Sequence, residues 1–112
     1  MYLGLYLEKP MIKPGHYPEI KKEKIIEYRN GTIEQGMKIG QFFFDNVNEE
    51  CGISVAPYEY DFWNPEQCKK IINWIEKNNI LIKENSLDEF FKVIDQYCKK
   101  AIELDTGVEI DL

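Results

Sequence analysis

The sequence predicts a single α+β domain over residues 1–112, in which a small mixed or antiparallel sheet packs with about three helices. Three observations predict this fold class. Near the start of the chain, apolar residues alternate with a period of two, as in a strand with one buried face. Longer stretches repeat with the period of a helix. With 112 residues and 44% hydrophobic residues, the chain can bury one core and is too apolar to be disordered.

The N-terminal segment predicts a strand followed by a loop. Residues 2–7 carry leucine at every second position, so we expect Leu3, Leu5 and Leu7 on the buried face of a first strand. Residues 9–18 contain three prolines and a glycine, and this density of breakers predicts a loop.

Residues 21–29 fit two interpretations. One is a helix that stops at Gly31, since glycine is common just past a helix end. The other is a strand with Ile26 and Tyr28 on its buried face, followed by a tight turn. The β-branched and aromatic residues at the end of this segment favour the strand.

Residues 32–51 predict the next helix. Spacings of three and four residues define one buried stripe, made of Ile33, Met37, Gly40, Phe44, Val47 and Cys51, and Phe43 widens it. Thr32 with Gln35 predicts a capping box, and Gly52 predicts the stop. A glycine on the buried stripe, Gly40, predicts close approach of another element. The rival interpretation is a hairpin through Gly31, with helix only from Gly40.

Residues 53–64 predict a central strand that leads into a helix. The apolar pattern changes register after Pro57, which predicts a kink or bulge there because proline cannot donate to a sheet. We then expect an inward face made of Tyr58, Tyr60 and Phe62. The outward face would be an exposed acidic-aromatic strip, here called the acidic strip, made of Glu59, Asp61 and Trp63.

The C-terminal half predicts two helices and a last strand. Asn64 and Pro65 form a strong helix start, and the helix should bury Cys68, Ile71, Ile72 and Ile75, with Trp74 at the border. Residues 80–82 are expected to be extended. A capping box of Ser86 with Glu89 predicts the last helix, whose apolar stripe comprises Leu87, Phe90, Phe91, Ile94, Tyr97, Cys98 and Ala101. Residues 108–112 predict a short strand that must pair in the sheet.

Charge and cysteine content narrow the class of protein. The net charge is −6 and Arg29 is the only arginine, so nucleic-acid binding is disfavoured and a basic protein partner is favoured. Three cysteines far apart predict reduced, buried thiols in a cytoplasmic protein. The chain has no signal-peptide pattern and no apolar run of membrane-spanning length.

Known catalytic patterns are absent from the sequence. It has no nucleophile elbow, zinc-protease motif, phosphate-binding loop or dinucleotide fingerprint. His16 lies in the predicted loop without a carboxylate at motif spacing, which is typical of a solvated side chain. Glu59 and Asp61 are expected to be a solvated pair rather than a metal or acid–base site. We therefore expect a non-catalytic protein with no cofactor and no metal.

Recognition of a partner is the remaining function. Aromatic residues are enriched at interface hot spots, and unpaired carboxylates are costly to bury. The predicted partner-binding residues are therefore Tyr58, Glu59, Tyr60, Asp61 and Trp63.

Three segments carry a family resemblance: D-F-W-N-P-E-Q-C at 61–68, E-F-F-K-V-I-D-Q-Y at 89–97 and A-I-E-L-D-T-G-V-E-I-D-L at 101–112. In these, and in size and acidity, the chain resembles small immunity proteins of bacterial polymorphic-toxin and contact-dependent growth-inhibition systems. The resemblance implies a cytoplasmic inhibitor that binds the C-terminal toxin domain of a cognate effector, often a nuclease. It assigns no site residue, because these families share no invariant motif.

Two other classes of function stay open. One is a small enzyme or ligand-binding domain, with a pocket between the predicted central strand and the long helix. A polar pocket holding His16 beside a carboxylate would favour it. The other is a subunit of a larger assembly, which requires a self-complementary apolar patch.

Overall fold

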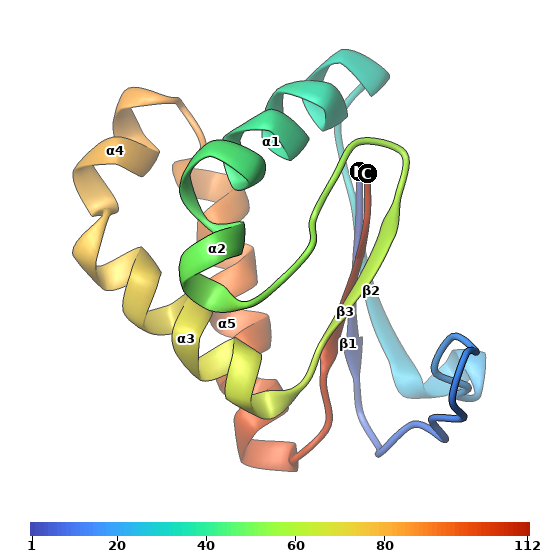
Figure 1. The fold of residues 1–112 in the computed structure, drawn as a ribbon. Helices are drawn as coiled ribbons and strands as arrows, with labels where there is room; N and C mark the ends of the chain where they lie inside the picture. Colours follow the sequence, from blue (N-terminus) through green and yellow to red (C-terminus); the bar gives the residue numbers. More distant parts are fainter.

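Helices cover one face of a four-stranded antiparallel sheet in the computed structural model, which describes residues 1–112 apart from the side chain of Ile33 (Figure 1). This confirms the predicted α+β class. In chain order the elements are β1 (Tyr2–Tyr6), the 3-10 turn η1 (Lys22–Lys24), β2 (Ile25–Arg29), α1 (Ile33–Asn46), α2 (Asn48–Cys51), β3 (Tyr60–Trp63), α3 (Pro65–Lys77), α4 (Asn79–Glu84), α5 (Asp88–Leu104) and β4 (Val108–Asp111).

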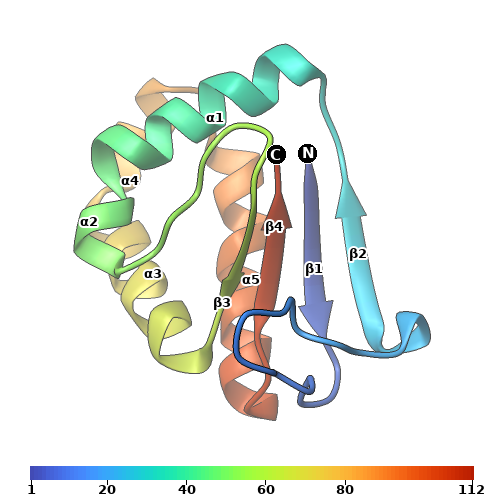
Figure 2. The same ribbon diagram turned by 45° about the vertical axis from the view of Figure 1, so that its right-hand side comes forward.

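The sheet has the order β2-β1-β4-β3, so the first and last strands are its centre. The two chain ends therefore lie side by side at one end of the sheet (Figure 2). The C-terminal strand and the strand at residues 25–29 are as predicted. The predicted central strand is wrong in position and length, because residues 53–59 form a loop and β3 is a four-residue edge strand.

The core lies between the sheet and the helices. Phe43 of α1 stacks between two rings, Trp63 of β3 at 6.1 Å and Phe91 of α5 at 5.4 Å between ring centroids. Leu3 and Leu5 enter this core from β1 as predicted, with 0% and 3% of their surfaces exposed. Leu7 is 37% exposed because β1 ends at Tyr6.

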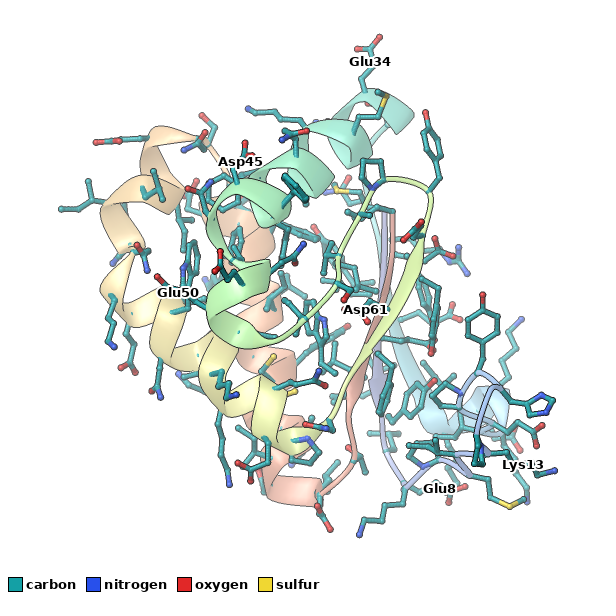
Figure 3. The ribbon with its side chains drawn as sticks, viewed as in Figure 1. Glu8, Lys13, Glu34, Asp45, Glu50 and Asp61 are labelled. Atoms are coloured by element: carbon teal, nitrogen blue, oxygen red, sulfur yellow. The ribbon has the colours of Figure 1, made fainter. Side chains whose placement is uncertain are left out.

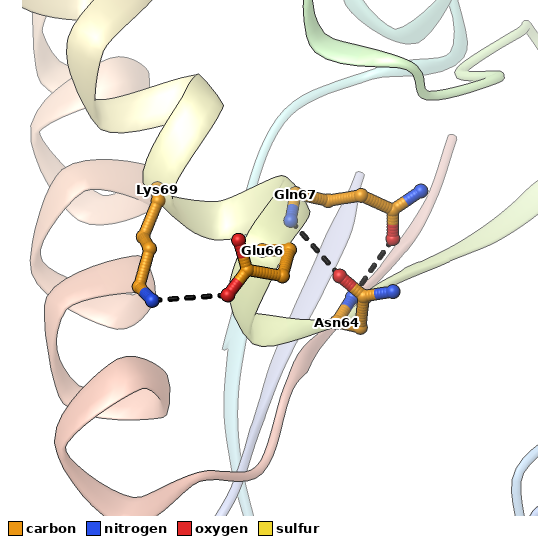
Figure 4. Close-up of polar contacts among 4 residues, drawn as sticks. All are labelled: Asn64, Glu66, Gln67 and Lys69. Carbon is orange, nitrogen blue, oxygen red and sulfur yellow. Dashed lines mark hydrogen bonds and ion pairs between the residues drawn. The ribbon is translucent and has the colours of Figure 1, made fainter.

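Two of the predicted helix starts are confirmed in detail. At Thr32 and again at Asn64 the side chain accepts a hydrogen bond from the third helical N–H. In return, the side-chain oxygen of Gln35 or Gln67 accepts the backbone N–H of the capping residue. Figure 4 shows the second box, with both hydrogen bonds between Asn64 and Gln67 at 2.9 Å. Gly52 ends α2 in the left-handed conformation, as expected of a stop.

The buried stripe of α1 is displaced from the predicted one. Met37 and Phe44 are 49% and 71% exposed, whereas the inward face consists of Gly36, Ile39, Gly40, Phe42, Phe43 and Val47. Gly40, Phe43, Val47 and Cys51 are buried as predicted, while Ile39 and Phe42 take the inward positions that were expected for Met37 and Phe44. Ile33, which the sequence places on the stripe, lies outside the described side chains. The rival hairpin is wrong, because residues 33–46 are helical.

Several smaller expectations are also wrong. Residues 80–82 were expected to be extended and belong to helix α4. A short apolar run fits a strand and a helix equally well, so this pattern could not decide between them. Ser86 does not cap α5, which begins after Leu87 without a side-chain cap. Ile26 is 45% exposed because β2 is an edge strand, and Trp74, at 3%, lies in the core while Ile72 and Ile75 are only partly buried.

Candidate binding face

The predicted acidic strip does not exist as one surface. Trp63 has no exposed surface, and its indole Nε1 donates to Oδ2 of Asp61 at 3.0 Å. The same carboxylate oxygen accepts the backbone N–H of Ser54, also at 3.0 Å. Asp61 therefore ties the 53–55 loop to β3 from inside, and neither Asp61 nor Trp63 is a free contact residue.

The turn at residues 57–58 explains this outcome. The strand begins only after this turn, so the turn sets which side chains lie on which face. Asp61 and Trp63 point toward the helices, and Tyr60 and Phe62 lie on the other face of the sheet. Tyr58 was expected inside and is 67% exposed, with a φ of 61°. Glu59 is exposed, as expected.

Tyr60 belongs to a buried polar cluster on the sheet face opposite the helices. The cluster centres on Glu109 of β4, which is 8% exposed. Its Oε2 accepts hydrogen bonds from the hydroxyls of Tyr60 at 2.8 Å and Tyr6 at 2.5 Å, and its Oε1 accepts one from Tyr2 at 2.5 Å. One carboxylate thus joins β1, β3 and β4.

Burial is the main reason why the pKa values of Tyr2, Tyr6 and Tyr60 are raised above the ordinary value, and the nearby Glu109 carboxylate adds to each rise. The three phenols therefore stay protonated donors near neutral pH. Sequence reasoning missed this cluster. The available signal was that β1 carries tyrosines as well as leucines, which indicates a strand covered on both faces.

The net negative charge of the chain comes from one segment. Residues 39–68 contain six acidic residues and no lysine, arginine or histidine, whereas the rest of the chain has 14 acidic and 14 basic residues. The whole net charge of −6 thus arises from this segment. It runs from the middle of α1 through α2 and the 53–59 loop to the start of α3, and these parts lie together on one side of the molecule (Figure 1).

Five of these six carboxylates are exposed, and Glu66 among them pairs with Lys69. The other four are Asp45, Glu49, Glu50 and Glu59. Figure 3 shows Asp45 on α1 and Glu50 on α2, with Asp61 beside β3. Among the described residues, none of the four forms an ion pair with a lysine or arginine of the chain. Together with exposed Phe44 and Tyr58 they form the surface that we call the acidic face.

Two hollows flank the 53–59 loop, and Glu59 lines both. The first, about 560 Å³, is an open groove lined by Phe44, Asn48, Glu49, Ile53, Ser54, Val55, Ala56 and Glu59. The second, about 390 Å³, lies on the other side of the loop and is lined by Tyr17, Tyr58, Glu59, Tyr60 and Asp111. We call the second hollow the tyrosine cleft. His16 lines neither of them.

Candidate metal ligands and thiols occur among the described residues. None of their histidine, cysteine or carboxylate side chains form a group of three that could hold a metal ion. The three cysteines are buried and free, and burial raises the pKa of the Cys51 thiol to about 11, which keeps it in the unreactive form. No helix in the described part of the chain is long and apolar enough to cross a membrane.

The chain was also compared with known proteins. No protein-family model, no curated protein and no solved structure matches it.

Proposed function

We propose that this chain is a binding protein whose acidic face docks onto a basic surface of another protein. The observation that carries the proposal is the separation of charge: the entire net charge of −6 arises from residues 39–68, and four of the carboxylates there are exposed without an ion pair among the described residues. A surface rich in carboxylates speeds encounter with an oppositely charged partner and disfavours wrong ones.

The apolar part of the face supports binding rather than solubility alone. Phe44 is 71% exposed and lines the groove beside the loop that carries Glu59, and Tyr58, in that loop, is 67% exposed. Aromatic side chains next to charged ones supply buried contact area at the centre of an interface. The acidic face therefore combines long-range attraction with short-range anchors.

The resemblance to immunity proteins suggests which class of protein the partner belongs to. We propose that it is a cognate toxin domain of the nuclease class, which is neutralised by stoichiometric binding. A nuclease holds substrate phosphates on basic side chains. The exposed carboxylates would occupy those positions, so binding would compete with nucleic acid.

Co-expression with the product of the neighbouring open reading frame tests the proposal by two measurements, pull-down of a complex and rescue of growth. We expect both to be lost or weakened at least tenfold in the double variant Glu49→Lys/Glu59→Lys. The matched control is Glu76→Lys/Glu84→Lys, which makes the same change of charge at exposed positions of α3 and α4. Equal loss in both variants would point to net charge alone and would overturn the role of the acidic face.

The aromatic anchor has its own matched pair. Phe44→Ala should slow growth rescue and speed dissociation of the complex, whereas Ile80→Ala, which removes a side chain 75% exposed on α4, should change neither. Absence of both a stable complex and protection with the parent protein would refute the proposed function.

A further inference from the structure

The tyrosine cleft has the chemistry of a receptor for a cation. Three aromatic rings line it, those of Tyr17, Tyr58 and Tyr60, and carboxylates stand at two places, Glu59 and Asp111. Cations are attracted to the faces of aromatic rings, and the attraction grows when the ring is shielded from water. Among the described residues, no lysine or arginine forms an ion pair with either carboxylate.

Two of the three rings of the cleft contact each other, and one of these two is also fixed by a hydrogen bond. Tyr17, from the 8–21 loop that crosses this face of the sheet (Figure 2), meets Tyr60 edge-on with 4.8 Å between ring centroids. The hydroxyl of Tyr60 is fixed by its hydrogen bond to Glu109. A ring that is already fixed, as that of Tyr60 is, loses little conformational entropy on binding.

The charge of the surroundings adds to the attraction. The hydrogen bond from Tyr60 to a carboxylate increases the electron density of its ring, which strengthens a cation–π contact. Glu59 also belongs to the acidic face, so a basic surface docked there lies beside the cleft. The cleft and the face can thus be occupied by one partner.

We infer that the tyrosine cleft receives one arginine side chain of the protein partner, a conclusion that rests on the proposed function and adds its anchor. A guanidinium group suits the cleft better than an ammonium group. It is planar and stacks on aromatic rings, and its fork of N–H donors can reach carboxylates on two sides. Lysine offers a compact, strongly hydrated charge and gains less from the rings.

A titration that needs no partner tests this inference. N-acetyl-arginine amide is added to the ¹⁵N-labelled protein, and chemical-shift changes are followed by NMR. We expect saturable changes at residues 17, 58–60 and 111, and binding at least about fivefold weaker for N-acetyl-lysine amide. N-acetyl-citrulline amide, which has the shape of arginine without its charge, should cause almost none.

Variants locate the site. Tyr17→Ala and the double variant Glu59→Gln/Asp111→Asn should each weaken arginine-amide binding by about fivefold or more, whereas Tyr17→Phe, which keeps the ring, should bind as the parent does. All these side chains lie at the surface, and the NMR spectrum itself reports whether each variant is folded. Equal shifts with citrulline amide, or shifts elsewhere on the protein, would overturn the inference.

The two proposals can fail separately. If a captured partner binds Tyr17→Ala and Asp111→Asn as tightly as the parent, the arginine anchor is wrong while the acidic face stands. If arginine amide occupies the cleft and no partner complex or protection is found, the proposed function is wrong while the cation site stands.

Discussion

The hydroxyl of Tyr60 on β3 donates a hydrogen bond of 2.8 Å to Oε2 of Glu109 on β4, and Glu109 is 8% exposed. This contact links the edge strand to the sheet centre through side chains as well as through the backbone. It also fixes one wall of the tyrosine cleft. The same carboxylate holds Tyr2 and Tyr6, so the stability of this face and the shape of the cleft depend on one residue.

Glu109→Gln should therefore destabilise the protein by about 1–3 kcal/mol. An amide brings N–H donors to a place where three hydroxyl donors converge, so a buried donor loses its acceptor. Urea unfolding at neutral pH measures the change. Glu103→Gln, at an exposed ion pair with Lys100, is the control and should change stability little. An unfolding midpoint unchanged by Glu109→Gln would contradict the account of this cluster.

Alkaline pH should unfold the protein through the same cluster. The pKa of Tyr6 is raised above its ordinary value of 10.0 by burial and then by the hydrogen bond to Glu109. The folded state therefore holds this proton more tightly than the unfolded state. Its contribution to stability is fully present below about pH 10 and is lost as the pH rises further toward the raised value.

Tyr6→Phe separates this effect from others. At neutral pH the variant should be less stable by about 1–2 kcal/mol, because a buried hydrogen bond to Glu109 is lost. Above about pH 10 the difference from the parent should shrink, since the variant has no phenol to ionise at this position. Urea unfolding of both proteins over a series of pH values measures the difference, and the cysteines, being common to both, cancel. A difference that stays constant up to about pH 11 would refute the linkage.

Gly40 allows α1 to touch the loop that carries Tyr58 and Glu59. A Cβ added at Gly40 would lie 2.6 Å from Cδ of Pro57, which requires the loop to move. The close approach predicted from sequence is thus confirmed. Gly40→Ala should destabilise by about 1–2 kcal/mol, since the overpacking outweighs the gain in helix propensity. It should also weaken partner binding by moving Tyr58 and Glu59.

Gly36→Ala is the matched control on the same helix. The nearest atom to its added Cβ would be the backbone oxygen of Leu112 at 3.1 Å, which requires a shift of only a few tenths of an ångström. We expect neutral or slightly improved stability by thermal unfolding, because alanine favours helix. Equal destabilisation by both substitutions would show that the contact with Pro57 is unimportant.

Local signals in the sequence determined more of this fold than long-range ones. The capping boxes at Thr32 and Asn64, the stop at Gly52 and the approach at Gly40 were predictable, because each depends on residues close in sequence or on one special residue. The same kind of local signal failed at Ser86. The position of β3 at the sheet edge was not, because β4, its partner, lies far along the chain. The orientation of Trp63 depended on where the turn at Pro57 ends, and a shift of one residue reverses a strand's faces.

For the candidate site, too, local features were predictable from the sequence and long-range contacts were not. Of the five predicted contact residues, Tyr58, Glu59 and Tyr60 line the tyrosine cleft, while Asp61 and Trp63 hold the loop from inside. The carboxylates of α1 and α2 were missed, although the lack of basic residues from 39 to 68 is readable in the sequence. The role of Glu109 was not readable, since its three tyrosine partners come from β1 and β3.

Tyr58 offers a direct comparison of stability with binding. Its φ of 61° lies in the left-handed region, which is unfavourable for a bulky aromatic residue. Strain of this kind persists at functional sites, and here it presents a ring that is 67% exposed at the tip of the loop. Tyr58→Gly should relieve the strain and raise the free energy of unfolding by up to about 1 kcal/mol.

Tyr58→Ala keeps the unfavourable φ and removes the same ring, so it should not gain this stability. Both variants should weaken partner capture and arginine-amide binding to a similar degree, because both lack the ring that lines the cleft. Urea unfolding and the NMR titration together measure the two effects. If the glycine variant is more stable and binds as tightly as the parent, the ring at position 58 has no part in recognition, and the strain at this turn needs another explanation.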